Sequence, residues 1–400
     1  MPITDTTISR RAGAIAATES LGLFWRFLED IDYENRSGEP GLLDFTFGDP
    51  REMAPAQYVA ALHDAIIPRN ERWFAYTFYD PDAQAAAAAG LRRLTGLPFA
   101  PEDMLLTTGG FAALSVGMKL VADPGDEIVY SLPPWFCYEA LAIEAGLTPV
   151  KVPIDRETLD LDLDAIAAAI TPRTRIVIVN SPNNPTGRVY APELLIRLAA
   201  VLEEASARHG RRIFILSDEP YNRIVFSGER FHTPAEFYPH TLIAYSYGKT
   251  LLAPGQRIGY LALPPALPER EALRDSLQIV QIAVGFAFPN AVMQHALPAL
   301  ETQSIDIGGL ERRRDLMVDA LRGMGYDVQR PQGTFYLFPR SPIPDDEAFA
   351  RSLAARNVLV VPGAVFETPG FFRICLTATD AMCEQALPAF AAAIGDAVPV

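Results

Sequence analysis

Lysine is rare in this chain of 400 residues, and one lysine stands in a segment where it could act chemically. Only Lys119, Lys151 and Lys249 are present, against thirty-one arginines. Because arginine supplies positive charge almost everywhere, a retained lysine points to a task that needs a deprotonated amine, such as attack on a carbonyl. The ordinary role of a lysine is a solvated surface charge, so the surroundings of Lys249 must decide between the two.

Lys249 lies in one of four polar turns that each follow a short β-branched run. The runs alternate with helical stretches such as Leu161–Ile170 and Ala191–Arg208. This alternation predicts an α/β fold with a mostly parallel sheet flanked by helices. Ligands bind beyond the carboxyl ends of such strands, so the four turns should converge. The runs and turns are Glu127–Tyr130 before SLPPWF, Arg175–Val179 before NSPNNPTG, Ile213–Leu216 before SDEPY, and Leu242–Tyr245 before SYGK.

The chain changes character after about Pro289, which predicts a second, smaller α+β domain. The first fifty residues are expected to join it, because Leu42–Pro50 (LLDFTFGDP) precedes the first βα unit. The predicted division is a large domain over 51–289 and a small domain made of 1–50 and 290–400. Its expected elements are helices at Asn290–Leu300, Ile307–Met324, Asp345–Arg356 and Ala381–Gly395, and strands at Gly333–Arg340, Val358–Val361 and Arg373–Thr377.

Three of the polar segments together resemble the signature of a known family. NSPNNPTG at Asn180–Gly187, SDEPY at Ser217–Tyr221 and SYGKTLLAPGQRIGY at Ser246–Tyr260 are similar, in order and spacing, to segments of the fold-type-I pyridoxal-phosphate-dependent aminotransferases of class I/II. NPTG alone is also an ordinary turn sequence, and its meaning comes from the other two segments. The resemblance runs from about Asp44 to the C-terminus and implies pyridoxal 5′-phosphate as the cofactor.

The resemblance implies roles for five residues around the cofactor ring. Lys249 would form a Schiff base with the cofactor aldehyde and later move the substrate proton. Asp218 would pair with the pyridine nitrogen and keep it protonated, although a carboxylate at a strand end can also cap a helix. Tyr221 and Asn184 match the residues that hydrogen-bond the ring 3-oxygen. Trp135, in PPWFCY, resembles the aromatic residue that stacks on the ring face.

A second group of residues matches the phosphate-binding positions of the family. A phosphate needs backbone amides at the start of a helix together with a cation. Gly109, Gly110 and Phe111 stand where a Gly-containing turn leads into a helical run, and their amides would meet the phosphate. Ser246 and Arg257 flank the lysine at the other phosphate-binding positions. A simple loop at the two glycines and a surface ion pair at the arginine are the alternatives.

The substrate carboxylate requires a bidentate partner, which is the strength of arginine. Arg373 in FFRICLT matches the family arginine that binds this carboxylate, and Asn184 is expected to contact it as well. Gly48 in FTFGDP resembles the glycine that lets an N-terminal segment approach the substrate. Tyr76 resembles a tyrosine that reaches the cofactor phosphate of a neighbouring subunit. A homodimer with a shared active site is therefore implied.

The chain departs from the family pattern at several points. Gly248 stands directly before the lysine, where the family often has serine, and the glycine that commonly follows the Tyr76-like residue is missing. The stretch Gln278–Phe288 carries no basic residue, whereas aspartate-specific members have an additional arginine near this point. This weighs against a dicarboxylic substrate. Ala287 stands where the family has serine or threonine.

The predicted function is therefore an aminotransferase that moves an amino group between an L-amino acid and a 2-oxo acid. A lyase, a cyclase or an oxidative deaminase on the same scaffold remains an alternative, because the cofactor performs the hard chemistry and the pocket chooses the bond that breaks. A pyridoxal-phosphate-sensing domain of a transcription regulator is a more distant alternative. About forty residues precede the LDFTFGDP segment, fewer than a DNA-binding domain needs.

Composition excludes several other classes of function. The net charge of −15 argues against a nucleic acid or an anionic membrane as partner, and a cytoplasmic protein is expected because no apolar run reaches the length of a membrane span. Neither GxSxG, GxGxxG nor a Walker phosphate loop occurs. No metal site is predicted, because the cysteines and histidines lack ligand spacing. They are Cys137, Cys375, Cys383, His63, His209, His232, His240 and His295.

Overall fold

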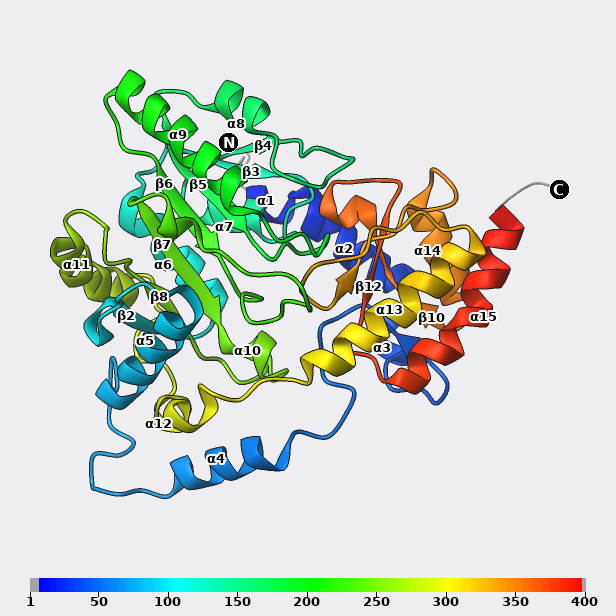
Figure 1. Ribbon diagram of the computed structural model, residues 1–400, viewed down its shortest axis with the longest axis horizontal. Coiled ribbons are helices and arrows are strands. Elements are labelled where there is room, and N and C mark those ends of the chain that lie inside the picture. The colour runs from blue at the N-terminus through cyan, green and yellow to red at the C-terminus, as the bar shows by residue number, and fades with distance from the viewer. Residues whose placement is uncertain (1–6, 398–400) are drawn as a thin grey trace, which may run out of the picture.

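A seven-stranded sheet organises the larger part of the molecule (Figure 1). The computed structural model describes residues 7–397, and in this part the strand order is β2-β8-β7-β6-β5-β3-β4. β8 runs antiparallel to both of its neighbours, β2 and β7, and all other adjacent strand pairs of this sheet are parallel. The predicted mostly parallel sheet is confirmed. The strands are β2 (Met104–Thr107), β3 (Glu127–Ser131), β4 (Thr148–Val152), β5 (Thr174–Asn180), β6 (Phe214–Asp218), β7 (Thr241–Ser246) and β8 (Gly259–Ala262).

Helices bury both faces of this sheet. Ile176 and Ile178 of β5 pack with α6, α7 and α11, whereas Val177 and Val179 pack with α8 and α9. The period of two places alternate residues on opposite faces, and burial of both faces explains the continuous apolar run RIVIV. α4, α5 and α12 cover β2, β7 and β8. These helices are α4 (Ala56–Ile66), α5 (Pro81–Thr95), α6 (Gly110–Val121), α7 (Tyr138–Glu144), α8 (Leu163–Ala169), α9 (Pro192–His209), α11 (Arg270–Ala283) and α12 (Ala291–Leu300).

Local signals set the ends of the longer helices. Asp80 caps α5 by accepting hydrogen bonds from the amides of Asp82 and Ala83, and Gly96 ends the helix with φ 77°. Pro192 is the first residue of α9, where its missing N–H costs nothing. The Ala-rich run before Gly90 is therefore helical, as its composition indicates.

A smaller unit is formed from both ends of the chain and lies beside the main sheet, with α13–α15 in yellow to red in Figure 1. Its core joins Phe24, Phe45, Val318, Leu359 and Phe372. It contains a parallel pair β1-β10 and an antiparallel sheet β11-β12-β9. Its elements are α2 (Glu19–Asp30), α3 (Tyr33–Arg36), β1 (Leu43–Asp44), α13 (Ile307–Met324), β9 (Tyr336–Leu337), α14 (Asp346–Ala354), β10 (Val358–Leu359), β11 (Val361–Pro362), η3 (Gly363–Phe366), β12 (Phe372–Cys375) and α15 (Asp380–Ala397).

Two expected strands of this unit are shorter than the sequence predicts. The segment Gly333–Arg340 contributes only β9, because Gly333 instead forms a bridge with Val225 of the larger unit. The run Val358–Val361 divides into β10 and β11, which pair with different partners, β1 and β12. Both corrections have the same cause, since backbone hydrogen bonds to distant segments decide where these short strands end.

α12 belongs with the larger unit. Met293, Ala296, Leu297 and Leu300 pack in the same core as α4 and α5. The division into two domains stays a proposal, and this packing moves its second boundary from 290 to the end of α12. The reason is the apolar face of α12, which the sequence pattern shows without showing what covers it.

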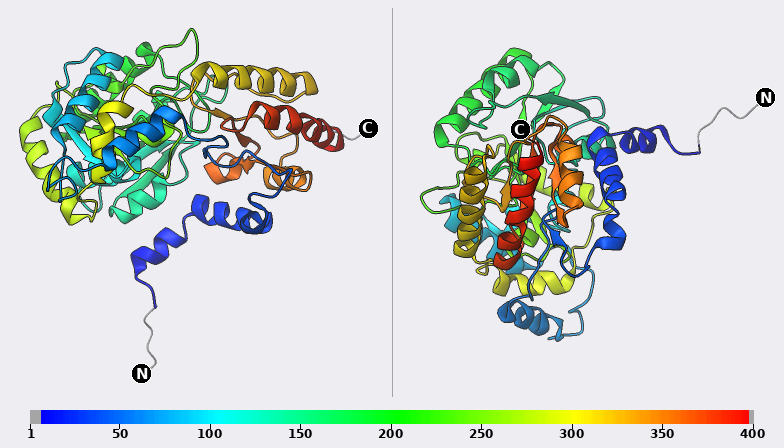
Figure 2. Two further views of the ribbon diagram at one scale, coloured as in Figure 1. Left: turned by 90° about the horizontal axis from the view of Figure 1, so that it is seen from below. Right: turned by 90° about the vertical axis from the view of Figure 1, so that its right-hand side faces the viewer.

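The N-terminal helix α1 (Arg10–Ala16) contacts α7 and projects from the body (Figure 2). The remaining short elements are η1 (Pro101–Asp103), η2 (Pro234–Glu236) and α10 (Tyr247–Thr250). Within residues 7–397 no helix is long and apolar enough to cross a membrane. The three cysteines are buried and unpaired, and no cluster of three potential metal ligands occurs in the same residues.

Candidate active site

The carboxyl ends of three neighbouring strands bring polar side chains together. Asn180 ends β5, Asp218 ends β6 and Ser246 ends β7. In the register of the sheet Asn180 lies opposite Asp218, and Asp218 lies opposite Ala244. Lys249 follows immediately in α10. The convergence that the alternation of strands and helices predicts is therefore present.

Asp218 is a buried carboxylate with a donor of its own. The hydroxyl of Tyr138 donates to Asp218 Oδ2 over 2.5 Å, and Asn180 Nδ2 donates to the backbone oxygen of Asp218 over 2.8 Å. Burial raises the pKa of Asp218 to about 6, while the Tyr138 hydroxyl and the Lys249 ammonium act in the opposite direction. Sequence reasoning did not select Tyr138, because a tyrosine three residues after Trp135 also suits a plain core position.

Lys249 is partly buried and its amine is surrounded by charge. Burial lowers the pKa of Lys249, and the guanidinium groups of Arg373 and Arg257 lower it further. Its Nζ lies 6.0 Å from the centre of the Phe335 ring. A lowered pKa raises the fraction of free amine, which is the form that attacks a carbonyl.

Gly248 has a steric reason for standing where the family often has serine. A Cβ at this position would come 3.1 Å from the Cα of Pro254. The turn Leu251–Pro254 thus packs directly on the backbone of α10. The departure from the family pattern follows from local packing around the lysine.

The start of α6 forms a cradle for an anion. Gly109 precedes the helix with φ 86°, and a Cβ there would lie 2.7 Å from Nη2 of Arg257. A Cβ on Gly110 would lie 3.5 Å from that of Ser246. Among the described residues no carboxylate pairs with Arg257, whose Nη1 donates only to the carbonyl of Pro254 over 2.6 Å. Free amides, a hydroxyl and an unpaired cation together fit a phosphate.

Aromatic rings border the cradle. Phe111, 44% exposed, places its ring edge-on to that of Trp135 with the centres 4.5 Å apart. Trp135 also contacts the ring of Tyr138 at 5.5 Å, so it lies beside the residue that binds Asp218. The predicted stacking role of Trp135 stays a prediction. The structure places its ring beside Tyr138, whose hydroxyl binds Asp218.

Arg373 is a buried cation without a counter-ion among the described residues, being only 4% exposed. Its Nη1 donates to Asn184 Oδ1 over 3.1 Å, its Nη2 donates to the carbonyl of Thr46 over 2.7 Å, and its buried Nε has no partner. The rings of Tyr336 and Phe366 flank the guanidinium at 4.4 and 4.8 Å. A buried charge of this kind is costly unless an anion binds it, so the group fits a carboxylate ligand.

Tyr221 and Gly48 join the larger unit to the smaller one at the site. The hydroxyls of Tyr221 and Tyr336 lie 3.1 Å apart, and burial raises the pKa of Tyr221 well above its usual value. A Cβ on Gly48 would come within 2.7 Å of the Phe335 ring. Only glycine therefore allows the N-terminal segment to pass this close to the rings.

Tyr76 is the one predicted site residue that the structure leaves apart from the others. It is 86% exposed, and its ring contacts Phe288 at 4.7 Å. It contributes nothing to the site of its own chain. Its predicted role requires a second copy and stays a prediction.

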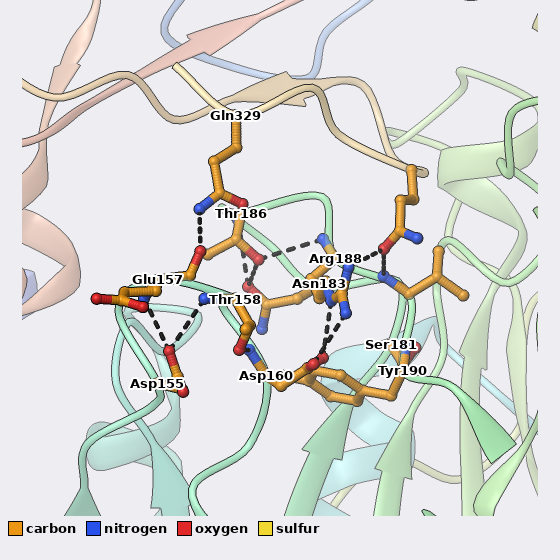
Figure 3. A network of polar contacts seen from close by, with 12 residues as sticks. Asp155, Glu157, Thr158, Asp160, Ser181, Asn183, Thr186, Arg188, Tyr190 and Gln329 are labelled. Carbon is orange, nitrogen blue, oxygen red and sulfur yellow. Dashed lines mark hydrogen bonds and ion pairs between the residues drawn. The ribbon is translucent and has the colours of Figure 1, made fainter. Parts of the chain in front are cut away.

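The turn that carries Asn184 is held by a polar network that sequence reasoning missed (Figure 3). The Asn184 amide donates to Asn180 Oδ1 over 2.8 Å, within the turn itself. Arg188 binds Asp160 through two hydrogen bonds of 2.7 and 2.8 Å and donates to Gln332 over 3.0 Å. These partners come from a loop before α8 and from the segment before β9, so no local pattern could have identified them.

The comparisons with known proteins agree with this geometry. The family described as aminotransferase class I and II matches residues 40–390. An aspartate/prephenate aminotransferase of Thermus thermophilus is 32% identical, with 98% of this chain and 99% of that protein covered. A crystal structure of an amino transferase from Eubacterium rectale superimposes with a TM-score of 0.90 at 29% identity, covering 99% of this chain and 100% of the other. Aspartate aminotransferase of Thermus thermophilus with maleate gives 0.82 at 29% identity, covering 97% and 100%.

The chain therefore belongs to the class I and II aminotransferases, and its fold is that of the fold-type-I enzymes. Members of this family depend on pyridoxal phosphate, and the residues present fit that cofactor. Two features carry this fit: the anion cradle at Gly109 with the unpaired Arg257, and the buried Asp218 at the end of β6.

Proposed function

We propose that this aminotransferase exchanges the amino group of an L-amino acid with that of a 2-oxo acid at Lys249. The observation that carries the proposal is the position of its amine. The Lys249 amine interacts electrostatically with the carboxylate of Asp218 and with the guanidinium groups of Arg373 and Arg257. Neither guanidinium group has an acidic partner among the described residues. One carboxylate and two unpaired cations around a lysine match a ring nitrogen, a substrate carboxylate and a phosphate.

Seven groups of this chain would hold pyridoxal phosphate. The amides at the start of α6, Ser246 and Arg257 would bind its phosphate, Asp218 would face its ring nitrogen and Trp135 its ring face. When bound, the cofactor supplies an aldehyde for the lysine and a ring that withdraws electrons from the substrate Cα. Tyr221 and Asn184 would hydrogen-bond the ring oxygen.

The protein's own part in the reaction is orientation and proton transfer. Arg373 would bind the substrate carboxylate through its two Nη groups, and the rings of Tyr336 and Phe366 keep its plane fixed. The Lys249 amine would then take the proton from the substrate Cα and deliver it to the cofactor carbon on the other side of the amino nitrogen. Burial lowers the pKa of Lys249 and so raises the fraction of free amine, which is the form that accepts a proton.

We also propose a homodimer. Large apolar side chains are exposed on α4, on the loop after it, on α11 and at Phe288, which is unusual for an isolated chain. Tyr76 lies in this region and would then reach the site of the second copy. The cytoplasmic location stays a prediction. The exposed residues are Val59 53%, Ile66 57%, Ile67 49%, Phe74 56%, Tyr76 86%, Ile279 69%, Ile282 50% and Phe288 38%.

The test is a titration of the holoenzyme with amino acids. We expect the absorbance of the lysine-bound cofactor to give way to that of the amine form, and a 2-oxo acid to restore it. Release of ammonia, consumption of oxygen, or elimination without the amine form would instead show a deaminase or a lyase.

A further inference from the structure

A series of aromatic rings extends from Arg373, the proposed carboxylate-binding residue, toward Trp135 and Phe47. Phe366 flanks Arg373 and contacts the ring of Phe136 at 6.2 Å. Phe136 continues to Trp135 at 6.3 Å and to Phe24 at 4.8 Å, and Phe24 meets Phe47 at 5.6 Å. These rings come from separate segments of the chain and form one continuous group, which we call the aromatic wall. Trp135, Phe136 and Phe47 are only partly buried, so their rings remain available to a ligand.

Apart from Arg373, two cations near the aromatic wall are already paired with carboxylates. Arg51, three residues after Gly48, pairs with Asp44 over 2.5 Å. Lys151 pairs with Glu367, the neighbour of Phe366, over 2.7 Å and with Glu139 over 3.1 Å. A second carboxylate on the substrate would have to displace one of these pairs.

An unpaired negative charge lies near Lys249. Asp49 follows Gly48 and has no salt-bridge partner among the described residues, and its carboxylate opposes the lowering of the Lys249 pKa. A substrate that carries a second carboxylate would therefore meet repulsion as well as the lack of a partner.

The segments that a second copy would bring are equally free of basic residues. Gln278–Phe288 contains none, and neither does Trp73–Tyr79. In the structure these two segments meet through Tyr76, Phe78 and Phe288, with ring centres 4.6 to 4.7 Å apart. Across the proposed dimer interface the site would gain further aromatic surface and no cation.

We propose that the preferred substrate is a monocarboxylic amino acid with an aromatic side chain. This proposal rests on the proposed function and specifies its substrate class. A ring would pack edge-to-face against the aromatic wall and exclude water from it, which is the geometry that aromatic pairs favour. The side-chain carboxylate of aspartate would instead lie against the aromatic wall without a hydrogen-bond partner, which is strongly unfavourable. In this respect the chain would differ from relatives that are named aspartate aminotransferases.

The first test measures binding without reaction. Calorimetric titration of the holoenzyme with 3-phenylpropanoate and with succinate compares two carboxylates that lack the amino group. We expect 3-phenylpropanoate to bind at least about 10-fold more tightly, because one ligand fills the wall and the other leaves a charge unpaired. Equal or tighter binding of succinate would overturn the substrate class, whatever reaction the enzyme performs.

The second test measures the half-reaction by stopped flow with L-phenylalanine, L-aspartate and L-alanine. We expect phenylalanine to form the amine form of the cofactor about 100-fold more efficiently than aspartate. Faster reaction with aspartate would overturn the substrate class and leave the proposed function intact. Failure of all three amino acids to yield the amine form, with 3-phenylpropanoate still bound preferentially, would overturn the proposed function alone.

A variant separates specificity from stability. Phe136→Ala should lower the efficiency with phenylalanine about 10-fold more than the efficiency with alanine, because only the larger substrate touches the lost ring. The matched control is Phe237→Ala, which removes a partly buried ring that contacts His232 at 6.2 Å and packs in the core with α8 and α9, outside the aromatic wall. It should affect both substrates equally. An equal loss with both substrates in Phe136→Ala would contradict the role of the wall.

Discussion

The two sides of the site differ in the chemistry of their side chains. The side that faces the proposed cofactor consists of single polar groups at the ends of adjacent strands, Asn180, Asp218 and Ser246, each with a defined partner or neighbour. The side that faces the proposed substrate consists of one buried guanidinium, Arg373, set among rings. The first side is polar and rigid, whereas the second is mostly apolar.

This difference follows from what each side must do. A cofactor is the same in every turnover, so a parallel sheet can present fixed groups to it from neighbouring strand ends. A substrate must be chosen, and the choice depends on side chains that meet only in the folded chain. We therefore expect specificity to depend on the contacts between the larger unit and the smaller one, where Tyr221 meets Tyr336 and Phe136 meets Phe366.

The largest expected effect belongs to the polar side. Lys249→Arg keeps the positive charge but removes the amine that can lose a proton, so turnover should fall more than about 1,000-fold. Stopped-flow measurement with saturating amino acid and cofactor checks this. Circular dichroism should show that the variant stays folded. Substantial turnover in the folded variant would show that the polar side is not the reacting side.

The next effect belongs to the apolar side. Arg373→Lys should lower kcat/KM about 100-fold, because a lysine cannot make the two-pronged contact with a carboxylate and would leave Asn184 without its donor. Cofactor affinity, measured by fluorescence titration of the apoprotein, should change little. If the affinity for the cofactor fell as much as kcat/KM, the separation into two sides would be wrong.

A smaller, pH-dependent effect is expected for Tyr138→Phe. The hydroxyl of Tyr138 stabilises the charged form of Asp218, so its removal should raise the pKa of that carboxyl above about 6. Protonated Asp218 cannot accept a hydrogen bond from a protonated ring nitrogen, so cofactor affinity should fall as the pH drops through about 6 in the parent and at a higher pH in the variant. Titrations of both apoproteins between pH 5 and pH 8 check the shift. Coincident profiles would exclude the role of Tyr138.

The smallest effect is expected for the turn that positions Asn184. Arg188→Ala removes the paired hydrogen bonds to Asp160 and the contact with Gln332, and kcat/KM should fall about 5-fold as the turn loosens. The matched control is Arg208→Ala, which breaks an exposed pair with Glu204 on α9. Steady-state kinetics of both variants compare them. Equal effects would show that the network stabilises the fold without positioning the turn.

The polar side was largely predictable from the sequence. Strand and turn patterns place Asp218 and Lys249 at one edge of a sheet, because consecutive parallel strands end on the same side. The glycines before α6 likewise indicate a helix start that binds an anion. Gly248 shows the limit of this reasoning, since only the approach of Pro254 explains its lack of a side chain.

The apolar side could not be predicted in the same way. Phe24, Phe136 and Phe366 are separated by more than one hundred residues from one another, and nothing local distinguishes them from core residues. The same holds for Arg188 and Asp160, whose pairing depends on two loops that meet only in the folded chain. The packing of α12 with α4 and α5 could not be predicted for a related reason, because a pattern shows an apolar face but not its partner.

The central claim is that Lys249 is the residue that carries the cofactor, and the scarcity of lysine makes it directly testable. Reduction of the holoenzyme with borohydride fixes the cofactor to the amine that binds it, and mass spectrometry of the digested protein locates the modified residue. Lys119 and Lys151 both pair with glutamates, and they serve as internal controls. We expect a single modified lysine, Lys249. A cofactor adduct on Lys119 or Lys151, or none on Lys249, would contradict it.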